Sequence, residues 1–184
     1  SYNNGDLIGR AIKSVLNQTY SFWELIIVDN FSKDQTDDVI KSFTDNRIKK
    51  LKINNKGVIA ASRNLGIKNS NGKYIAFLDS DDWWVNKKLE MSMFYLNKGF
   101  DLVYHDLFLV KSIKAKYFFR KVGSRKLKKN IFEDLIENGN AIPNSSVVLK
   151  RSLLMKINLI SENLDLIGWE DFDCWLRLSL QSKK

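Results

Sequence analysis

The fold of this chain is decided by the stretch Gly72-Lys73-Tyr74-Ile75-Ala76-Phe77-Leu78-Asp79-Ser80-Asp81-Asp82-Trp83-Trp84. Its residues 74–78 are continuously apolar, as is typical of a strand covered on both faces of a sheet. Asp79, Asp81 and Asp82 then crowd at the end of that strand, where their repulsion is costly unless a cation or hydrogen-bond donors offset it. A hard divalent ion such as Mg2+ or Mn2+, shared with a substrate diphosphate, would offset it.

The acidic cluster can be compared with two common local structures, the helix N-cap and the EF-hand loop. Asp is a frequent turn residue and helix N-cap, so Asp82 can simply start the following helix. An EF-hand loop is excluded, because Asp79-Ser80-Asp81 is not followed by the required glycine and distant glutamate. The cluster therefore predicts either a cation site or a helix start.

Composition limits the chemistry that this chain can perform. Its 184 residues, 44% of them hydrophobic, suit one domain over 1–184 with one core. We find no secretory signal and no apolar run long enough to cross a bilayer. The single cysteine, Cys174, excludes an internal disulfide and fits a reducing cytoplasm. Because His105 is the single histidine, acid–base chemistry must fall mostly to carboxylates.

The net charge of +9 is concentrated in one segment. Residues 111–129 hold nine Lys or Arg and no Asp or Glu, interleaved with aromatic side chains. Such a segment can lie on anionic lipid, which predicts peripheral membrane contact, or hold a phosphorylated acceptor. A solvated basic face is an equally good explanation. Nucleic acid is not expected as a partner, because that needs a continuous basic face with stacking aromatics.

Helical and strand patterns alternate along the chain. Helices are predicted at 6–16, 35–43, 58–68, 86–97, 130–137 and 169–180, and strands at 22–28, 48–53, 74–78, 101–110, 116–122 and 145–149. This alternation indicates an α/β sandwich whose active groups collect at the carboxyl ends of the strands. Arg63 and Asn64, on the predicted helix 58–68, sit among alanines on an otherwise apolar surface, where a guanidinium is usually paired or directed at phosphate.

Several linked motifs carry a resemblance that covers nearly the whole chain. They are residues 1–4, 14–20, 23–36 and 57–66, then Asp79-Ser80-Asp81, then Trp169-Glu170-Asp171-Phe172-Asp173. In this order they resemble the family 2 glycosyltransferases. The resemblance implies a GT-A fold, which is a three-layer α/β sandwich with a mixed central sheet. It also implies a nucleotide-sugar donor, Mn2+ or Mg2+ as cofactor, and an inverting transfer.

The resemblance also implies roles for individual side chains. The residues that would bind the nucleotide are Tyr2, Asp29, Arg63, Asp79 and Ser80. Asp81 and Asp79 would bind the metal. Asp171 would be the catalytic base, with Glu170 beside it. These types suit the reaction, because a metal offsets charge on the leaving diphosphate and a carboxylate takes the acceptor's proton. Asp171 can also be explained as an acidic residue in a helix's first turn.

Weaker expectations concern the acceptor. His105 and Asp106 follow a predicted strand and are placed on the acceptor side, although a structural histidine explains the pattern equally well. Trp169 is expected to line the same groove, and Trp83 and Trp84 can stack on sugar rings. Core packing is the usual fate of tryptophan.

The chain departs from the family pattern at its ends and in one loop. The apolar first strand that normally precedes Ser1 is absent, so we expect a domain truncated at both ends, with exposed sheet edges. Phe31 stands where the family usually has glycine, and Asn30 replaces a frequent aspartate.

The function expected from the sequence is transfer of a sugar from a nucleotide diphosphate, taken as UDP, to a glycan or lipid-linked acceptor of a bacterial surface. The expected location is the cytoplasm, at the inner face of the membrane. A sugar nucleotidyltransferase is the alternative enzyme, but it needs a glycine-rich basic triphosphate loop near the start, and none is visible. An inactive carbohydrate- or lipid-binding module on the same scaffold stays open.

Overall fold

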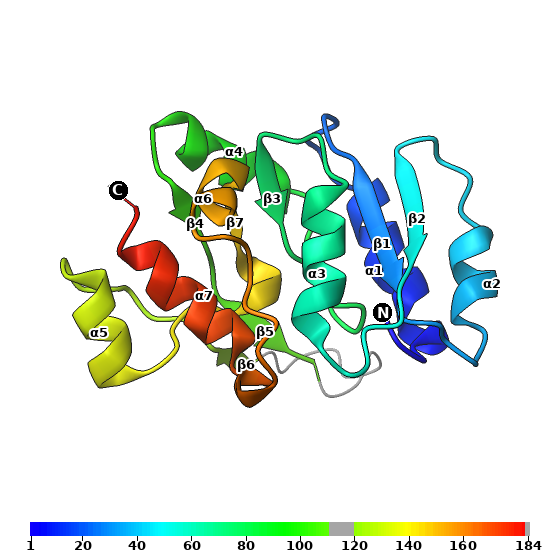
Figure 1. Ribbon diagram of the computed structural model, residues 1–184. Coiled ribbons are helices and arrows are strands. Elements are labelled where there is room, and N and C mark those ends of the chain that lie inside the picture. Colours follow the sequence, from blue (N-terminus) through cyan, green and yellow to red (C-terminus); the bar gives the residue numbers. More distant parts are fainter. Residues whose placement is uncertain (111–119, 183–184) are drawn as a thin grey trace.

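The computed structural model describes residues 1–110 and 120–182, in which helices and strands alternate (Figure 1). The helices are α1 (Gly5–Leu16), α2 (Thr36–Lys41), α3 (Ile59–Lys68), α4 (Lys88–Asn97), α5 (Ile131–Asn138), α6 (Arg151–Lys156) and α7 (Glu170–Ser179), with 3-10 turns η1 (Asn144–Ser146) and η2 (Leu164–Leu166). The strands are β1 (Leu25–Asp29), β2 (Ile48–Lys52), β3 (Tyr74–Ala76), β4 (Leu102–Val103), β5 (Leu107–Leu109), β6 (Arg120–Val122) and β7 (Val148–Lys150).

The strands pair in both directions. β1 is parallel to β2, with Leu25 opposite Ile48 and Asp29 opposite Lys52. A parallel pair needs a crossover connection, which α2 provides. β7 lies between β3 and β4 and runs antiparallel to both, while β5 and β6 form a separate antiparallel pair. The mixed sheet arrangement predicted from the sequence is confirmed.

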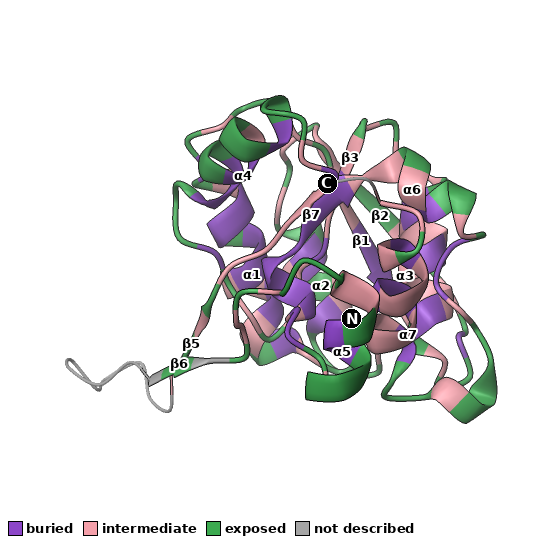
Figure 2. Cartoon of the chain, turned by 90° about the vertical axis from the view of Figure 1, so that its left-hand side faces the viewer, coloured by how far each residue is buried: buried purple, intermediate pink, exposed green. Residues whose placement is uncertain are grey.

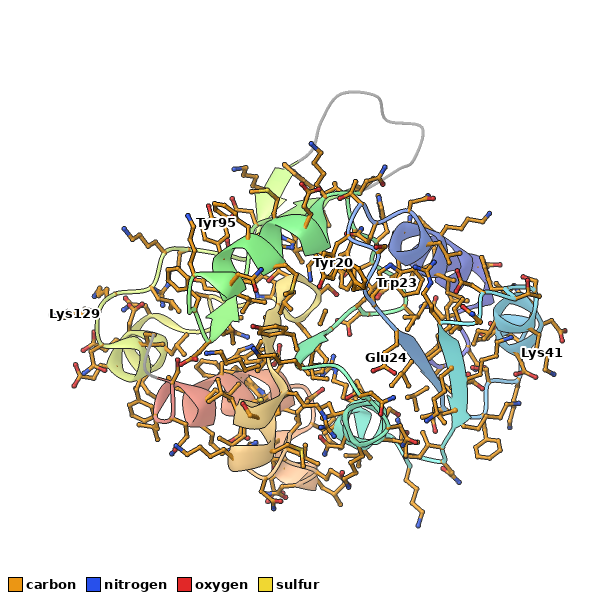
Figure 3. The ribbon with its side chains drawn as sticks, turned by 90° about the horizontal axis from the view of Figure 1, so that it is seen from above. Tyr20, Trp23, Glu24, Lys41, Tyr95 and Lys129 are labelled. Atoms are coloured by element: carbon orange, nitrogen blue, oxygen red, sulfur yellow. The ribbon has the colours of Figure 1, made fainter. Side chains whose placement is uncertain are left out.

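Helices cover the strands on both faces. Figure 3 looks down on this sandwich, with α1 and α4 on one face and α3, α6 and α7 on the other. Figure 2 shows β7 as a buried strand in the middle of the molecule, whereas the outer surfaces of α4 and α5 are exposed. The three-layer α/β arrangement therefore agrees with the expectation.

The final helix is anchored by its apolar face. Cys174, Trp175 and Leu178 are at most 3% exposed and pack with Leu149 of β7 in one cluster. Their spacing puts them on one side of α7, so burying them fixes the rotation of the helix about its axis. Truncating a core residue such as Leu149 costs roughly 3 kcal/mol. Burial also raises the pKa of the Cys174 thiol to about 12.

The sheet is interrupted between β1 and β3. A cavity of about 1030 Å³ separates them and is lined by apolar side chains such as Ile26, Val28 and Ile75. Tyr20 and Trp23, labelled in Figure 3, line it near the start of β1. Within the described residues β1 pairs only with β2, and β3 only with β7.

Some predicted elements differ from the observed ones. β3 ends at Ala76 rather than Leu78, and the predicted strand 101–110 is broken into β4 and β5 at residues 104–106. The predicted strand 145–149 begins instead as the turn η1, and α6 was not predicted. The explanation of Asp82 as a helix N-cap is wrong, because α4 begins only at Lys88.

Two expectations lie partly outside the described residues. The predicted strand 116–122 and the basic segment 111–129 both include residues 111–119, so the structure describes only their later parts. In the described ranges, no helix combines the length and apolar character that crossing a membrane requires.

Candidate functional site

Arg63 links two parts of the chain that the sequence separates widely. From α3 its guanidinium reaches the Asp79 carboxylate at 3.0 Å and the Glu170 carboxylate at 3.2 Å. The Arg63 side chain is 16% exposed and that of Glu170 only 9%, whereas Asp79 is 40% exposed. Of the two predicted roles of Arg63, pairing or contact with phosphate, the structure shows pairing. Its two carboxylate partners come from the end of β3 and the start of α7.

The acidic turn after β3, Asp79–Asp82, is held by hydrogen bonds from several parts of the chain. Asn4 donates through Nδ2 to the Ser80 hydroxyl at 2.7 Å, and Arg10 of α1 donates to the Asp81 carbonyl at 2.6 Å. From η1, Asn144 Nδ2 donates to the Asp79 carboxylate at 3.0 Å. These bonds involve the Ser80 hydroxyl, a backbone carbonyl and one carboxylate, so they fix the path of the turn.

Asp81 is the exposed member of this turn. In the described part of the chain its carboxylate has no recorded hydrogen bond or ion pair. Its neighbour Asp82 is half-buried, and burial raises the pKa of the Asp82 carboxyl, a rise that the charges of Asp81 and Asp79 increase. The turn therefore combines one free carboxylate with others that are already paired or shielded.

The carboxylates of Asp79 and Asp81 suit one kind of metal site. Within the described residues, no three acidic, histidine or cysteine side chains converge in a way that would hold a metal ion by themselves. Mg2+ and similar ions commonly use one or two protein carboxylates, with water and substrate phosphate completing the shell. The free Asp81 carboxylate, with Asp79 two residues away, fits that second type of site.

Asp29 ends β1 and is almost fully buried, at 2% exposed. Its carboxylate accepts bonds from the Ser32 hydroxyl at 2.5 Å and from the Ser32 amide at 3.1 Å. Two bonds leave further lone pairs on the two carboxylate oxygens. Ser1 lies beside Asp29, since the Asn30 amide donates to the Ser1 carbonyl at 2.8 Å.

The position of Ser1 shows that the separate polar groups share one region. Ser1, which adjoins Asp29, lines the same cavity as Arg63 and Asp79. Tyr2, the next residue, is 58% exposed and lines the cavity together with Arg63 and Asp79. The predicted nucleotide-side residues therefore gather at one end of the sheet.

The loop after β1 has the backbone that glycine would adopt most easily. Phe31 has φ +48°, in the left-handed region, and its side chain is 56% exposed. This conformation carries a steric cost for a residue with a side chain. Phe31 therefore has a backbone conformation that glycine adopts at a lower steric cost.

Glu170 and Asp171 begin α7 and differ in their surroundings. Glu170 is paired with Arg63 and also accepts from the Gly168 amide at 2.7 Å. Asp171 is half-buried, and its carboxylate accepts from the Phe172 amide at 2.7 Å. Burial raises the pKa of Asp171, while the positive charge of Arg63 opposes that rise. A carboxyl with a raised pKa is better matched to taking up a proton near neutral pH.

The expected acceptor-side residues are not brought together. Asp106 binds Lys121 at 3.0 Å and the Ser124 hydroxyl, and its backbone carbonyl contacts the His105 ring at 2.8 Å. None of these recorded contacts involves Arg63 or its partners. Trp169, by contrast, directly precedes Glu170 and is 62% exposed.

The adjacent tryptophans have different surroundings. Trp84 is 7% exposed and belongs to a core cluster, whereas Trp83 is 39% exposed and has Arg10 stacked 3.7 Å from its ring. The prediction from sequence left both open. Only Trp83 has a surface available to a sugar ring.

Sequence reasoning missed the residues that hold the acidic turn. Asn4, Arg10 and Ser145 are distant from Asp79–Asp82 in the chain, and no local spacing marks them. Ser145 opens the predicted strand 145–149, but it lies in η1, and the side chain of the adjacent Asn144 donates to Asp79. A tertiary contact of this kind has no signature in a single sequence.

Comparisons with known proteins were made on the whole chain. The model of the family described as "Glycosyl transferase family 2" matches residues 1–157. The Escherichia coli protein "UDP-Glc:alpha-D-GlcNAc-diphosphoundecaprenol beta-1,3-glucosyltransferase WfgD" is 35% identical over 97% of the chain and 66% of its own length. Another relative is an uncharacterized glycosyltransferase of Rickettsia conorii, 36% identical over 99% of the chain and 29% of its own length.

A solved structure has a similar fold. S. aureus TarS 1-349 in complex with UDP is 19% identical, with a TM-score of 0.75, over 100% of this chain and 54% of that one. At this identity the likeness shows the fold alone, which confirms the GT-A expectation. The chain thus spans between about a third and two thirds of the length of these proteins.

Proposed function

Because this chain belongs to family 2 of the glycosyltransferases, we propose that it transfers a sugar from a nucleotide-diphosphate donor to a glycan or lipid-linked acceptor. We take UDP as the nucleotide and inversion at the anomeric carbon as the outcome. The observation that carries the proposal is the double ion pair of Arg63, which joins residues 107 positions apart in the chain. It places the start of α7 beside the acidic turn of β3.

The donor's nucleoside is assigned to the end of β1. Asp29 is buried there and retains lone pairs, so it can accept a hydrogen bond from a base N–H group. Tyr2 offers an exposed ring beside it, on which a base can stack. Asp79 and Ser80 lie on the ribose and diphosphate side. Support comes from the cavity, whose lining includes Val28 and Asn30 on either side of Asp29 together with Asp79 and Ser80.

A divalent ion, Mn2+ or Mg2+, is the proposed cofactor, with Asp81 and Asp79 as its protein ligands. When bound, it offsets the negative charge that develops on the leaving diphosphate. A solved mannosyltransferase of Pyrobaculum calidifontis is described with GDP-Man and Mn2+; at 16% identity it supports the fold and suggests the ion to test.

Transfer requires a base on the acceptor side, and we assign that role to Asp171. Its carboxylate takes the proton from the acceptor hydroxyl as that oxygen forms a bond to the anomeric carbon. The bond from this carbon to the diphosphate oxygen breaks at the same time, and its electron pair leaves with the nucleoside diphosphate. Half-burial and a raised pKa suit Asp171 for accepting a proton. Glu170 keeps Arg63 in place through its ion pair.

For the acceptor we propose only its chemical class, a glycan or lipid-linked molecule. The name of the Escherichia coli relative gives a diphosphoundecaprenol acceptor for that protein. A lipid-linked acceptor here would bring the protein to the inner face of a membrane, where the basic residues 111–129 could contact anionic lipid. Sedimentation with vesicles, with and without anionic lipid, tests this. Equal binding to both kinds of vesicle would contradict the electrostatic contact.

Titration calorimetry with UDP, in the presence and absence of Mn2+, tests the main proposal. Metal-dependent binding supports the transferase. Binding only to glycans or anionic vesicles would favour a binding module instead. A screen of UDP-sugars for metal-dependent hydrolysis then identifies the donor. Absence of hydrolysis with every nucleotide sugar would contradict the proposed transferase activity.

A further inference from the structure

The turn η1 (Asn144–Ser146) contacts the acidic turn Asp79–Asp82 at two points, both on Asp79. Asn144 donates to the Asp79 carboxylate, as described above. The Asp79 amide donates to the Ser145 hydroxyl at 3.0 Å. Ser145 is 2% exposed, so water does not replace this bond when it is absent. The turn η1 thus holds both the backbone and the side chain of Asp79.

Trp84 fixes the other side of η1. Its indole N–H donates to the Ser145 carbonyl at 2.8 Å. Lys88, which is 4% exposed, stacks 3.9 Å from the centre of the same indole and donates to the Val147 carbonyl at 3.4 Å. The indole is therefore held by packing, by its own hydrogen bond and by the buried amino group of Lys88.

We infer that Trp84 and Ser145 are positioning residues, which hold the backbone of Asp79–Asp81 in the conformation that receives the donor's diphosphate. The inference rests on the proposed function for the identity of that ligand. Neither residue needs to touch the donor. Their effect passes through the Asp79 amide, whose direction decides where the Asp81 carboxylate lies two residues later. Small displacements of such groups are costly, because binding requires their geometry to be correct within about 0.5 Å.

The chain supplies a matched control for each residue. Ser146 is also fully buried, but its hydroxyl donates to the carbonyl of Pro143, just before η1. Trp23 lies near the start of β1, where its ring contacts Arg47 at 3.6 Å. Ser145→Ala is therefore compared with Ser146→Ala, and Trp84→Phe with Trp23→Phe.

Titration of each variant with UDP and Mn2+ is the first measurement. We expect Ser145→Ala and Trp84→Phe to weaken metal-dependent UDP binding about five- to tenfold, the effect of one lost hydrogen bond. The two controls are expected to stay within about twofold of the unchanged protein. Thermal unfolding is recorded in parallel, because a purely structural role lowers stability without changing the affinity of the folded molecules.

Amide exchange of Asp79 is the second measurement, and it does not depend on any nucleotide. Loss of the Ser145 hydroxyl removes the acceptor of this amide, so Ser145→Ala should accelerate its exchange more than Ser146→Ala does. Unchanged UDP affinity in both Ser145→Ala and Trp84→Phe would overturn the inference. Equal Asp79 exchange in Ser145→Ala and Ser146→Ala would also overturn it. If the unchanged protein fails to bind UDP, the proposed function falls, and the exchange result alone decides the positioning role.

Discussion

The acidic turn after β3 and the start of α7 both present carboxylates to Arg63, but their surroundings hold them in different ways. Asn4, Arg10 and η1 fix the turn from three separate parts of the chain. At α7, Asp171 has a hydrogen bond only from the Phe172 amide among its recorded ones, and burial determines its pKa. The comparison teaches that the turn proposed to bind the donor is preformed by tertiary bonds, while the proposed base at the start of α7 is tuned by its environment.

The strongest test of this comparison is Asp171→Asn. We expect the rate constant for transfer to fall roughly 1000-fold, because a general base typically contributes 10²–10⁴. UDP affinity should stay within about twofold, since Asp171 lies outside the preformed turn. Asp173→Asn is the control, because Asp173 is paired with Arg177 at 2.7 Å in the same helix. A large loss of UDP affinity in Asp171→Asn would break the division between the two sides.

The complementary change is Asp81→Asn. It removes the free carboxylate of the turn, so Mn2+-dependent UDP binding should weaken by more than about 100-fold. Binding measured without metal is the internal control and should change little. Calorimetry with and without Mn2+ checks this, and an equal loss in both conditions would show that Asp81 acts on the turn rather than on the ion.

Arg63→Met tests the link between the two sides. It leaves Glu170, whose side chain is 9% exposed, without its cation, and we expect the free energy of unfolding to fall by about 2 kcal/mol. Urea unfolding measures this loss. The double variant Arg63→Met with Glu170→Gln should recover part of it, because no buried charge is then left unpaired. Losses that simply add would contradict this.

The smallest expected effect is on pH dependence. Burial raises the pKa of Asp171 above its usual 3.8, and the base acts only when deprotonated. Transfer should therefore decline as pH falls through the raised pKa, so the acid limb of kcat/KM should lie above 3.8. Glu170→Gln removes a negative neighbour that raises this pKa and should therefore move the limb to lower pH. A shift to higher pH would contradict the role of the Glu170 charge.

The order of elements and the acidic strand end could be predicted because they depend on local patterns. Apolar runs and helical spacing gave β1, β3 and most helices to within a few residues. The pairing of Arg63 was also predictable, since a guanidinium on an otherwise apolar surface needs a partner. The identity of its carboxylate partners depends on how α7 packs, which sequence spacing alone does not determine.

Prediction from the sequence was weakest where distant segments define the geometry. Residues 145–149 have the apolar content of a strand, but η1 turns at Asn144–Ser146 and its polar side chains bind the acidic turn instead. Trp83 and Trp84 are adjacent and chemically identical, so only the fold separates the buried ring from the exposed one. His105 and Asp106 were placed near the acceptor on strand order, while their recorded contacts lie with the β5–β6 region.

The buried cysteine has a consequence for chemical labelling. Cys174 is 0% exposed, and burial raises the pKa of its thiol to about 12, so the reactive thiolate is scarce in the folded molecule. We therefore expect a thiol-alkylating reagent to leave the folded protein unmodified. Modification should become fast only in urea that releases α7 from the core, and mass spectrometry checks this.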